Sequence, residues 1–375
     1  MIRTDCSNFP LDRPCRPHKQ KGVKCSSCGK YLPVVSPAKT ARILIIKIGA
    51  MGDVLRTTFL LEGLAEKYKH PDITWIVAPH SAAILEQNPH INRVWSFDCG
   101  IFAKITAEKF DICVNLDLGP ESLGLATLAV ASKKIGFSLD AGRRIVCSGP
   151  AAKQWLEMSA FDDLKKKNNR TYQYWMAKIC GLVRNDYEIC TPLDKASVKK
   201  AEVFRRRHGL AGHRLIGINP GAGKRWKYKK WTDQGYLKLI AEAGAMGAKV
   251  LLLGGPEEDQ LIAKLVKSSK GRAVSAGTGN SLYDFFALLN LCDIVVTGDT
   301  LALHAALGLK KKVVALFGPT SSAEIEIYGR GTKIVTPAQC ACCYLQDCGV
   351  RPDCMKLIRP EEVVRAVKQY LPVTK

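Results

Sequence analysis

The fold is decided by the stretch RILIIKIGAMGDVLRTT, which runs from Arg42 to Thr58. An apolar run, Ile43–Ile46, leads into a turn of small residues, and a helical pattern begins just after Asp53. A short apolar run bounded by glycines and followed by a helix predicts a buried strand of a parallel sheet. In such a sheet ligands bind outside the carboxyl ends of the strands, so Gly49, Gly52 and Asp53 lie where a ligand is expected.

The same alternation of strand and helix recurs along most of the chain, which predicts two doubly wound α/β units in series. The expected strands are Ile43–Ile46, Ile73–Val77, Val94–Phe97, Ile112–Asp117, Lys134–Phe137, Leu215–Asn219, Lys249–Leu253, Ala273–Ser275, Ile294–Thr297, Val313–Phe317 and Lys333–Thr336. We therefore expect a Cys-rich appendage at 1–40, an N-terminal domain at 41–195 and a C-terminal domain at 196–375. The sequence leaves open whether the closing helix, which begins at Pro360, packs back on the N-terminal domain.

The bulk composition points to an anionic partner. The chain of 375 residues holds 56 Lys and Arg against 34 Asp and Glu, a net charge of +22, which suits a phosphorylated substrate, a nucleic acid or an acidic membrane surface. The N-terminus lacks the apolar core of a signal peptide, and no apolar run approaches the roughly 18 residues of a membrane span. We expect a cytoplasmic protein, in which the 15 cysteines do not form a disulfide framework and those that cluster are better explained by metal ligation.

The acid in the opening stretch has two interpretations. Asp53 is an N-cap, which would satisfy free N–H groups of the following helix, a catalytic base, or both. The turn before it has neither the GxGxxG spacing of a dinucleotide fingerprint nor the GxxxxGK[ST] of a P-loop. This argues against nicotinamide binding and against P-loop ATP hydrolysis.

A basic turn follows the first strand of the second unit. In GINPGAGKRWKYKKW, Gly217–Trp231, the glycines Gly221 and Gly223 lead into five cations within seven residues. Lys224 and Arg225 at the tip of such a turn suit a diphosphate, although a solvated basic loop would have the same composition.

Two further strand ends carry polar residues. Gly254 and Gly255 are followed by Glu257, which either binds a ribose or is an acid favoured by the helix dipole. Asp299 and Thr300 precede a helix whose N-terminus is a ready anion site, with His304 in its first turns. Taken alone, His304 would more often be a packed helix residue.

Together these segments resemble glycosyltransferase family 9, the ADP-heptose:lipopolysaccharide heptosyltransferases. The matching stretches occur in the family's order and are ILIIKIGAMGDVLRTT, NPGAGKRW, LLLGGPEE, GDTLALHAALG and VVALFGPT. The resemblance implies a GT-B architecture of two Rossmann-like domains facing across a cleft. It also implies an inverting transfer that needs no metal for chemistry, with the donor on the C-terminal domain and the acceptor on the N-terminal one.

The resemblance also assigns roles. Asp53 would be the general base, Lys224 a donor-phosphate ligand and Glu257 the ribose ligand, with Asp299 and Thr300 at the sugar-diphosphate end. Arg225 and His304 complete the expected donor site. Leu301 stands where many members have glycine, and its Cβ is expected to alter the approach of the backbone to a phosphate.

The expected partners are a nucleotide diphosphate sugar, ADP-heptose by resemblance, and a lipid-linked glycan acceptor at the inner face of the cytoplasmic membrane. The alternative is a non-catalytic nucleotide-sugar-binding protein whose zinc-stabilised segment docks a partner. A nucleic-acid-binding role is not expected, because the cations cluster where a diphosphate would sit. The sequence leaves the oligomeric state open.

The cysteines form two clusters. Near the N-terminus the ligand set Cys15, His18, Cys25 and Cys28 has the paired spacing of a closed, tetrahedral structural zinc site, with an iron–sulfur cluster or free thiols as alternatives. Near the C-terminus a second set resembles a cysteine loop of many heptosyltransferases, and either binds a metal or is metal-free; it comprises Cys340, Cys343, Cys348 and Cys354.

Overall fold

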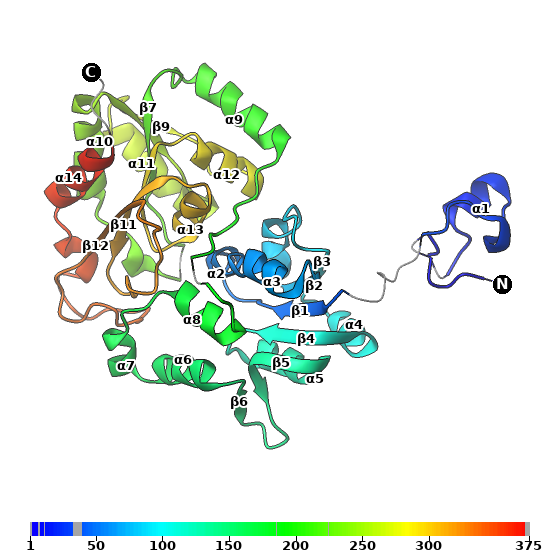
Figure 1. Ribbon diagram of the computed structural model, residues 1–375. Coiled ribbons are helices and arrows are strands. Elements are labelled where there is room, and N and C mark those ends of the chain that lie inside the picture. The colour runs from blue at the N-terminus through cyan, green and yellow to red at the C-terminus, as the bar shows by residue number, and fades with distance from the viewer. Residues whose placement is uncertain are drawn as a thin grey trace.

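The computed structural model describes residues 2–6, 8–10, 12–32, 40–184, 186–223 and 225–371. It contains two six-stranded sheets, one from each half of the chain (Figure 1). The predicted two-unit α/β fold is therefore confirmed.

The N-terminal sheet has the strand order β3-β2-β1-β4-β5-β6. Its strands are β1 Arg42–Ile46, β2 Asp72–Val77, β3 Arg93–Ser96, β4 Lys109–Asn115, β5 Val130–Leu139 and β6 Ile145–Cys147. All pair in parallel except β6, which is antiparallel to β5. The pattern did not predict β6, because a three-residue, largely exposed edge strand carries no apolar periodicity.

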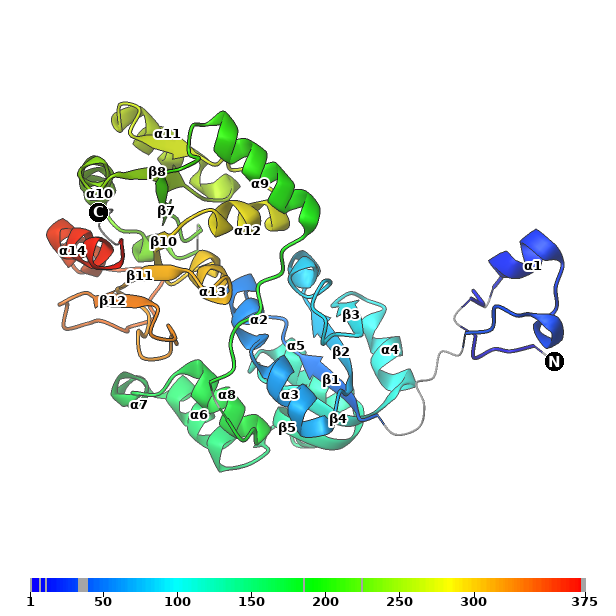
Figure 2. The same ribbon diagram turned by 45° about the horizontal axis from the view of Figure 1, so that its top comes forward.

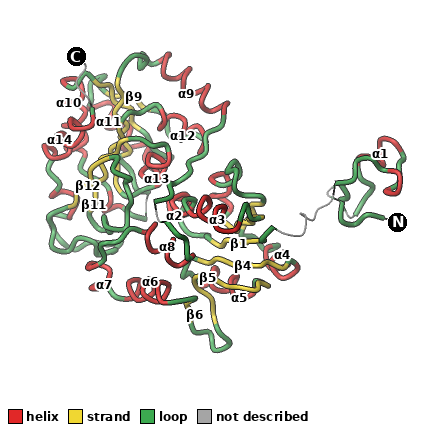
Figure 3. The backbone as a smooth tube through the Cα atoms, in the orientation of Figure 1, coloured by secondary structure: helices red, strands yellow, loops and turns green. Residues whose placement is uncertain are grey.

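The C-terminal sheet is wholly parallel, with the order β12-β11-β10-β7-β8-β9. Its strands are β7 Arg214–Asn219, β8 Ala248–Leu252, β9 Ala273–Ser275, β10 Ile294–Gly298, β11 Lys312–Phe317 and β12 Gly331–Val335. They are nearly continuous apolar runs because helices cover both faces of the sheet (Figure 3).

The helices of the first half are α2 Met51–Thr57, α3 Leu60–Tyr68, α4 Ile101–Ala107, α5 Pro120–Leu128, α6 Pro150–Ala160, α7 Asp162–Lys167 and α8 Tyr172–Cys180. Those of the second are α9 Lys195–Arg207, α10 Asp233–Ala245, α11 Asp259–Ser268, α12 Leu282–Asn290, α13 Leu301–Gly308 and α14 Pro360–Tyr370. Short 3₁₀ turns are η1 Cys25–Ser27, η2 Pro79–Ile84, η3 Lys227–Lys229, η4 Pro256–Glu258 and η5 Cys354–Leu357.

The helix expected at Val54–Tyr68 is split in two. The hydroxyls of Thr57 and Thr58 donate to the backbone carbonyls of Asp53 and Leu55, at 2.6 and 2.7 Å, and such back-bonding competes with a continuous helix. Thr58 also accepts the N–H of Cys190, so the break is held by a distant segment.

The two halves share one hydrophobic cluster. It runs from Trp75 in β2 through Val54 in α2 to Leu303 in α13 and Phe317 in β11. Helix α14 packs instead in a second cluster beside β10 and β11, with Val363 and Val367 fully buried. Figure 2 shows α2 and α13 side by side where the halves meet.

The N-terminal segment, with α1 at Arg16–Lys21, lies apart from both sheets in the two views (Figures 1 and 2). Within the described ranges, no helix has the length and apolar character needed to cross a membrane.

Candidate functional site

A cavity of about 830 Å³ lies between the two halves. Its lining comes from the turns that leave β1, β7, β8, β10 and β11, so the carboxyl ends of both parallel sheets open into one space. Of the residues expected at the site, the cavity is lined by Gly49, Gly52, Asp53, Gly221, Gly223, Arg225, Gly254, Gly255, Asp299, Thr300 and His304.

Asp53 faces the cavity from the first turn of α2, with 38% of its side chain exposed. The N-cap residue of α2 is Ala50, so Asp53 does not cap the helix. Its carboxylate is 2.9 Å from the Arg56 guanidinium. Desolvation raises the pKa of Asp53, but the charges of Arg56 and Lys47 more than offset it, and the pKa lies below the usual value. The group is therefore an ionised carboxylate at neutral pH.

Arg56 is held from behind by an aromatic ring. Its guanidinium lies 3.9 Å from the centroid of the Tyr172 ring, and the Tyr172 hydroxyl is 2.8 Å from that of Thr57. Tyr172 begins α8, more than a hundred residues away in the chain. The Asp53–Arg56 pair is thus oriented by the junction of α2 with α8.

The turn before α2 is organised by Asp117, which follows β4. Its carboxylate accepts the N–H groups of Ile48 and Gly49 at 2.9 and 3.1 Å and pairs with the buried ammonium of Lys47. Desolvation lowers the pKa of Lys47, but the charges of Asp117, Tyr172 and Asp53 together raise it above its usual value. This pair fixes the backbone that presents Asp53.

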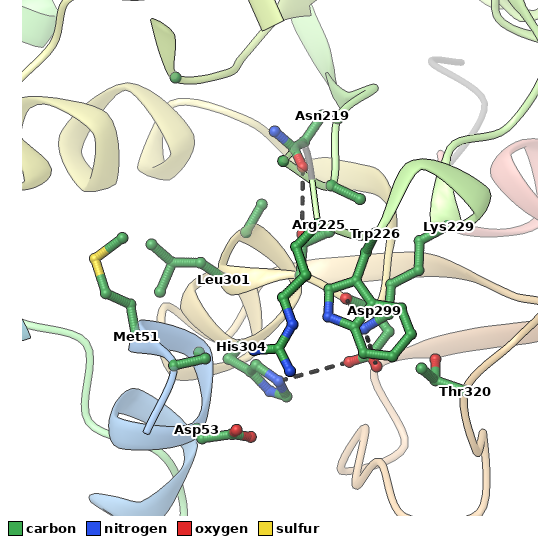
Figure 4. Close-up of a pocket in the computed structure, with 18 of the residues that line it drawn as sticks. Met51, Asp53, Asn219, Arg225, Trp226, Lys229, Asp299, Leu301, His304 and Thr320 are labelled. Atoms are coloured by element: carbon green, nitrogen blue, oxygen red, sulfur yellow. Dashed lines mark hydrogen bonds and ion pairs between the residues drawn. The ribbon is translucent and has the colours of Figure 1, made fainter. Parts of the chain in front are cut away.

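Asp299 faces Asp53 from the C-terminal half. Its carboxylate accepts a hydrogen bond from the Lys229 ammonium at 3.0 Å, and the His304 ring nitrogen is 3.8 Å away (Figure 4). Desolvation raises the pKa of Asp299, but the charges of Lys229, of His304 in its protonated form and of Arg56 outweigh it and bring the pKa to about 2.

His304 is a buried, neutral imidazole. Desolvation, followed by the Arg56 charge, lowers the pKa of His304 to about 4. Its ring packs on α2: a Cβ placed on Gly52 would be 3.2 Å from the His304 ring. A glycine at position 52 therefore lets α2 and α13 approach closely.

The strand ends around Asp299 are tied together by one amide. The Asn219 oxygen accepts hydrogen bonds from the hydroxyls of Thr297 and Thr300, each at 3.2 Å. Because Thr300 points back to Asn219, it does not cap α13, and the first N–H groups of this helix are left for a ligand. The Leu301 side chain is directed toward Met51 and away from Asp299 (Figure 4).

The glycine turns meet at Glu258. The Glu258 carboxylate accepts the N–H groups of Gly223 and Gly255, each at 3.1 Å, and is buried. A Cβ on Gly221 would be 2.0 Å from the Glu258 side chain. The predicted Glu257 is exposed and does not line the cavity, but its carboxylate also lies at this turn, 2.9 Å from where a Cβ on Gly223 would stand.

The basic turn is described only in part, because Lys224 lies outside the described residues. Arg225 and Trp226 reach into the cavity from the C-terminal half (Figure 4). The Lys229 ammonium lies 4.8 Å from the centroid of the Trp226 ring and also forms an ion pair with Asp299.

Sequence reasoning missed several residues that line or support the site: Arg56, Asp117, Tyr172, Asn219, Lys229, Glu258, Glu324 and Tyr344. Asn219 and Asp117 do stand at ends of predicted strands, which is a signal that could have found them. Tyr172 and Glu324 carry no local signal, because they reach the site only through the packing of distant segments.

The predicted zinc site receives no support. Within the described ranges, no three or more His, Cys, Asp or Glu side chains form a group that could hold a metal ion. His18 directs its Nδ1 to the Val23 carbonyl oxygen at 2.9 Å, and Cys15 is the N-cap residue of α1 with no side-chain hydrogen bond to the helix. The described residues therefore give no support to a metal at the set Cys15, His18, Cys25 and Cys28 or at the set Cys340, Cys343, Cys348 and Cys354.

Known proteins with similar sequences are heptosyltransferases. Lipooligosaccharide heptosyltransferase 2 of Campylobacter jejuni is 25% identical over 169 residues, which are 42% of this chain and 52% of that protein. The chain thus spans about half the length of this relative. Lipooligosaccharide heptosyltransferase 2 of Haemophilus ducreyi is 24% identical over 303 residues, 75% of this chain and 84% of that protein.

Solved structures show the same fold. The glycosyltransferase family 9 protein of Veillonella parvula superposes with a TM-score of 0.68 at 21% identity, covering 88% of this chain and 97% of that one. ADP-heptose LPS heptosyltransferase II of E. coli gives a TM-score of 0.63 at 16% identity, over 88% and 98% of the two chains.

The model of the glycosyltransferase family 9 (heptosyltransferase) domain matches residues 102–351, about two thirds of the sequence. The match covers α4 through the loop before η5, and with it β7, β8, β10 and β11, whose ends line the cavity. By this match, and by the order of motifs seen in the sequence, the chain belongs to glycosyltransferase family 9.

Proposed function

We propose that this protein is an inverting glycosyltransferase that moves a heptose from ADP-heptose to a lipopolysaccharide-type acceptor, with Asp53 as the general base. The observation that carries the proposal is the pair of opposed groups on one cavity. An ionised, partly exposed carboxylate lies on the N-terminal side, and the open start of α13 with Arg225 lies on the C-terminal side.

The chemistry follows from these positions. Asp53 takes the proton of an acceptor hydroxyl as the hydroxyl oxygen bonds to the anomeric carbon of the donor sugar. The bond from that carbon to the diphosphate oxygen breaks on the opposite face, and ADP departs with the bonding electron pair. Fixed cations and helix N–H groups aimed at the departing diphosphate lower the barrier because they need no reorganisation during the reaction.

The low pKa of Asp53 is compatible with this role. A base must be deprotonated before it can act, and Arg56 and Lys47 keep Asp53 ionised at neutral pH. Arg56 engages one carboxylate oxygen, which orients the group in the cavity. We assign the acceptor to residues 41–195 and the donor to residues 196–375.

A glycan acceptor anchored in an anionic membrane would suit the net charge of +22, since basic surfaces are attracted to acidic lipids. We therefore place the reaction at the inner surface of the cytoplasmic membrane. The relatives named as heptosyltransferases support the choice of sugar.

The test is Asp53→Asn, which keeps the shape of the side chain and removes the base. Transfer from ADP-heptose, followed as ADP release with acceptor present, should fall by about 10²–10⁴-fold, while ADP-heptose affinity measured by calorimetry stays close to that of the wild type. Glu62→Gln, an exposed acid of the next helix, is the matched control and should keep full activity.

If Asp53→Asn transfers the sugar at the normal rate, the base assignment is wrong. If the wild-type protein binds ADP-heptose but releases no ADP with any glycan acceptor, the alternative of a non-catalytic nucleotide-sugar-binding protein replaces the proposal.

A further inference from the structure

Besides Asp53, Asp299 and Glu258, a further acidic side chain lines the cavity and has no role in the chemistry above. Glu324 lies in the connection between β11 and β12, is 9% exposed and contributes to the cavity wall. No described residue donates a hydrogen bond to its carboxylate or forms an ion pair with it. A buried carboxylate without donors is costly to folding, so its presence requires an explanation.

The backbone holds Glu324 in place. Its carbonyl oxygen accepts the N–H of Tyr172 at 2.9 Å, which joins this loop to the start of α8. The next residue, Ile325, is 3% exposed and belongs to the hydrophobic cluster shared by the two halves. The side chain is therefore presented to the cavity by a fixed segment.

Two of the cations that line the cavity are already paired. Arg56 pairs with Asp53, and Lys229 pairs with Asp299. Burial raises the pKa of Glu324, and the charges of Arg56 and Lys165 only partly offset this effect. The Thr320 hydroxyl, on the same loop and 4% exposed, is likewise buried with no partner among the described residues. Two unpartnered polar groups on one wall indicate that polar groups of a bound ligand form hydrogen bonds with them.

We propose that the Glu324 carboxylate accepts hydrogen bonds from hydroxyl groups of the donor's sugar and thereby selects which sugar the enzyme transfers. The proposal rests on the proposed function, because it places the sugar of the donor in this cavity. A carboxylate can only accept, and its two oxygens match two adjacent hydroxyls. The sugar is the part of a nucleotide diphosphate sugar that offers such donors beyond the diphosphate.

The position favours the donor sugar over the acceptor. Strand β11 pairs with β10, and β10 ends at Gly298, directly before Asp299 and the start of α13. Glu324 therefore lies on the same edge of the same sheet as the groups assigned to the diphosphate. A sugar attached to that diphosphate would extend along this wall.

The experiment compares ADP with ADP-heptose by calorimetry in the wild type, in Glu324→Gln and in the control Glu326→Gln. Glu326 is two residues away, accepts the Tyr328 N–H at 2.7 Å and does not line the cavity. Glu324→Gln should bind ADP as the wild type does and bind ADP-heptose about 10- to 100-fold more weakly, the usual effect of losing hydrogen bonds to a charged group. The control should bind both ligands normally.

A series of singly deoxygenated ADP-heptoses identifies the hydroxyl. Removing the hydroxyl that Glu324 binds should weaken binding to the wild type and have no further effect on Glu324→Gln. Because the side chain makes no internal hydrogen bond, the melting temperature of the free variant should equal or exceed that of the wild type.

The proposal is overturned if Glu324→Gln binds ADP-heptose normally, if it loses ADP and ADP-heptose equally, or if only the Michaelis constant of the acceptor changes. A lower melting temperature with unchanged discrimination among the deoxy sugars would make Glu324 a structural residue. The proposed donor fails separately, if the wild type binds ADP-heptose no more tightly than ADP. In that case the affinities of the wild type and Glu324→Gln for UDP-glucose and GDP-mannose are compared in the same way. If Glu324→Gln changes the affinity for neither of these nucleotide sugars, the role proposed for Glu324 is wrong.

Discussion

At the scale of single residues, the site depends on buried ion pairs that hold backbone as well as charge. Lys47 and Asp117 have side chains that are 6% and 16% exposed, and Asp117 also accepts two N–H groups of the turn before α2. Removing one partner of such a pair leaves a buried charge uncompensated, and this destabilises the folded protein more than replacing both partners by apolar residues does.

Asp117→Asn should therefore lower the free energy of unfolding by about 3–5 kcal/mol, because Lys47 is left buried and unpaired. Adding Lys47→Met in the same chain should recover much of this loss. Urea denaturation measures both variants. Equal stability of Asp117→Asn and the wild type would contradict the structural role given to the pair.

His304 makes stability depend on pH. Its folded-state pKa of about 4 lies below the usual value of 6.5, so between these pH values the unfolded chain binds a proton that the folded protein does not. Stability should fall as the pH decreases from 6.5 to 4, by about 1–3 kcal/mol from this group.

His304→Gln should flatten that part of the stability curve, measured as the free energy of unfolding at pH 6.5, 5.5 and 4.5. His213→Gln, an exposed position, is the control and should keep the wild-type slope. An unchanged slope in His304→Gln would mean that other groups produce the pH dependence.

At the scale of elements, the nucleotide side is built by two turns that interlock. The turn after β7 and the 3₁₀ turn η4 after β8 meet at Glu258, whose two oxygens take one N–H from each. The absence of a Cβ at position 221 gives Glu258 its space.

Gly221→Ala should displace Glu258 and open both turns, since the new Cβ would lie 2.0 Å from its side chain. ADP binding, measured by calorimetry, should weaken by about tenfold or more because two hydrogen bonds to a charged group are lost. Gly244→Ala in α10 meets nothing within 4 Å and should bind ADP normally. Normal binding by Gly221→Ala would show that the interlock does not support the site.

At the scale of the whole molecule, the body of the protein is the two sheets with α2 and α13 between them, and the N-terminal segment lies outside it (Figure 1). Within the described ranges, the side-chain hydrogen bonds of residues 2–32 stay inside that segment.

Deleting residues 1–39 should therefore leave the melting temperature and ADP affinity unchanged. Differential scanning calorimetry and titration of ADP measure these quantities. A melting temperature several degrees lower would show that the segment packs against the body. A loss of acceptor binding alone would assign the segment to the acceptor.

Local pattern was sufficient for every strand except β6 and for several of the polar residues that follow the strands. The sequence predicted four residues that line the cavity: Asp53, Arg225, Asp299 and His304. Each follows a buried parallel strand, and the backbone there lies at the ligand-binding edge of the sheet regardless of side-chain type. Pattern did not distinguish Glu257 from its neighbour Glu258, since both begin the same turn and only packing buries one of them.

The sequence by itself determined two largely parallel sheets and the family to which they belong, because apolar periodicity and turn glycines are local properties of the chain. Only the tertiary structure decided how Asp53 is held and what faces it. Arg56, Tyr172 and Glu324 come from segments far apart in the chain, and they meet because α2, α8 and the loop after β11 pack together. Such contacts follow from burial of distant surfaces against each other, which no local pattern records.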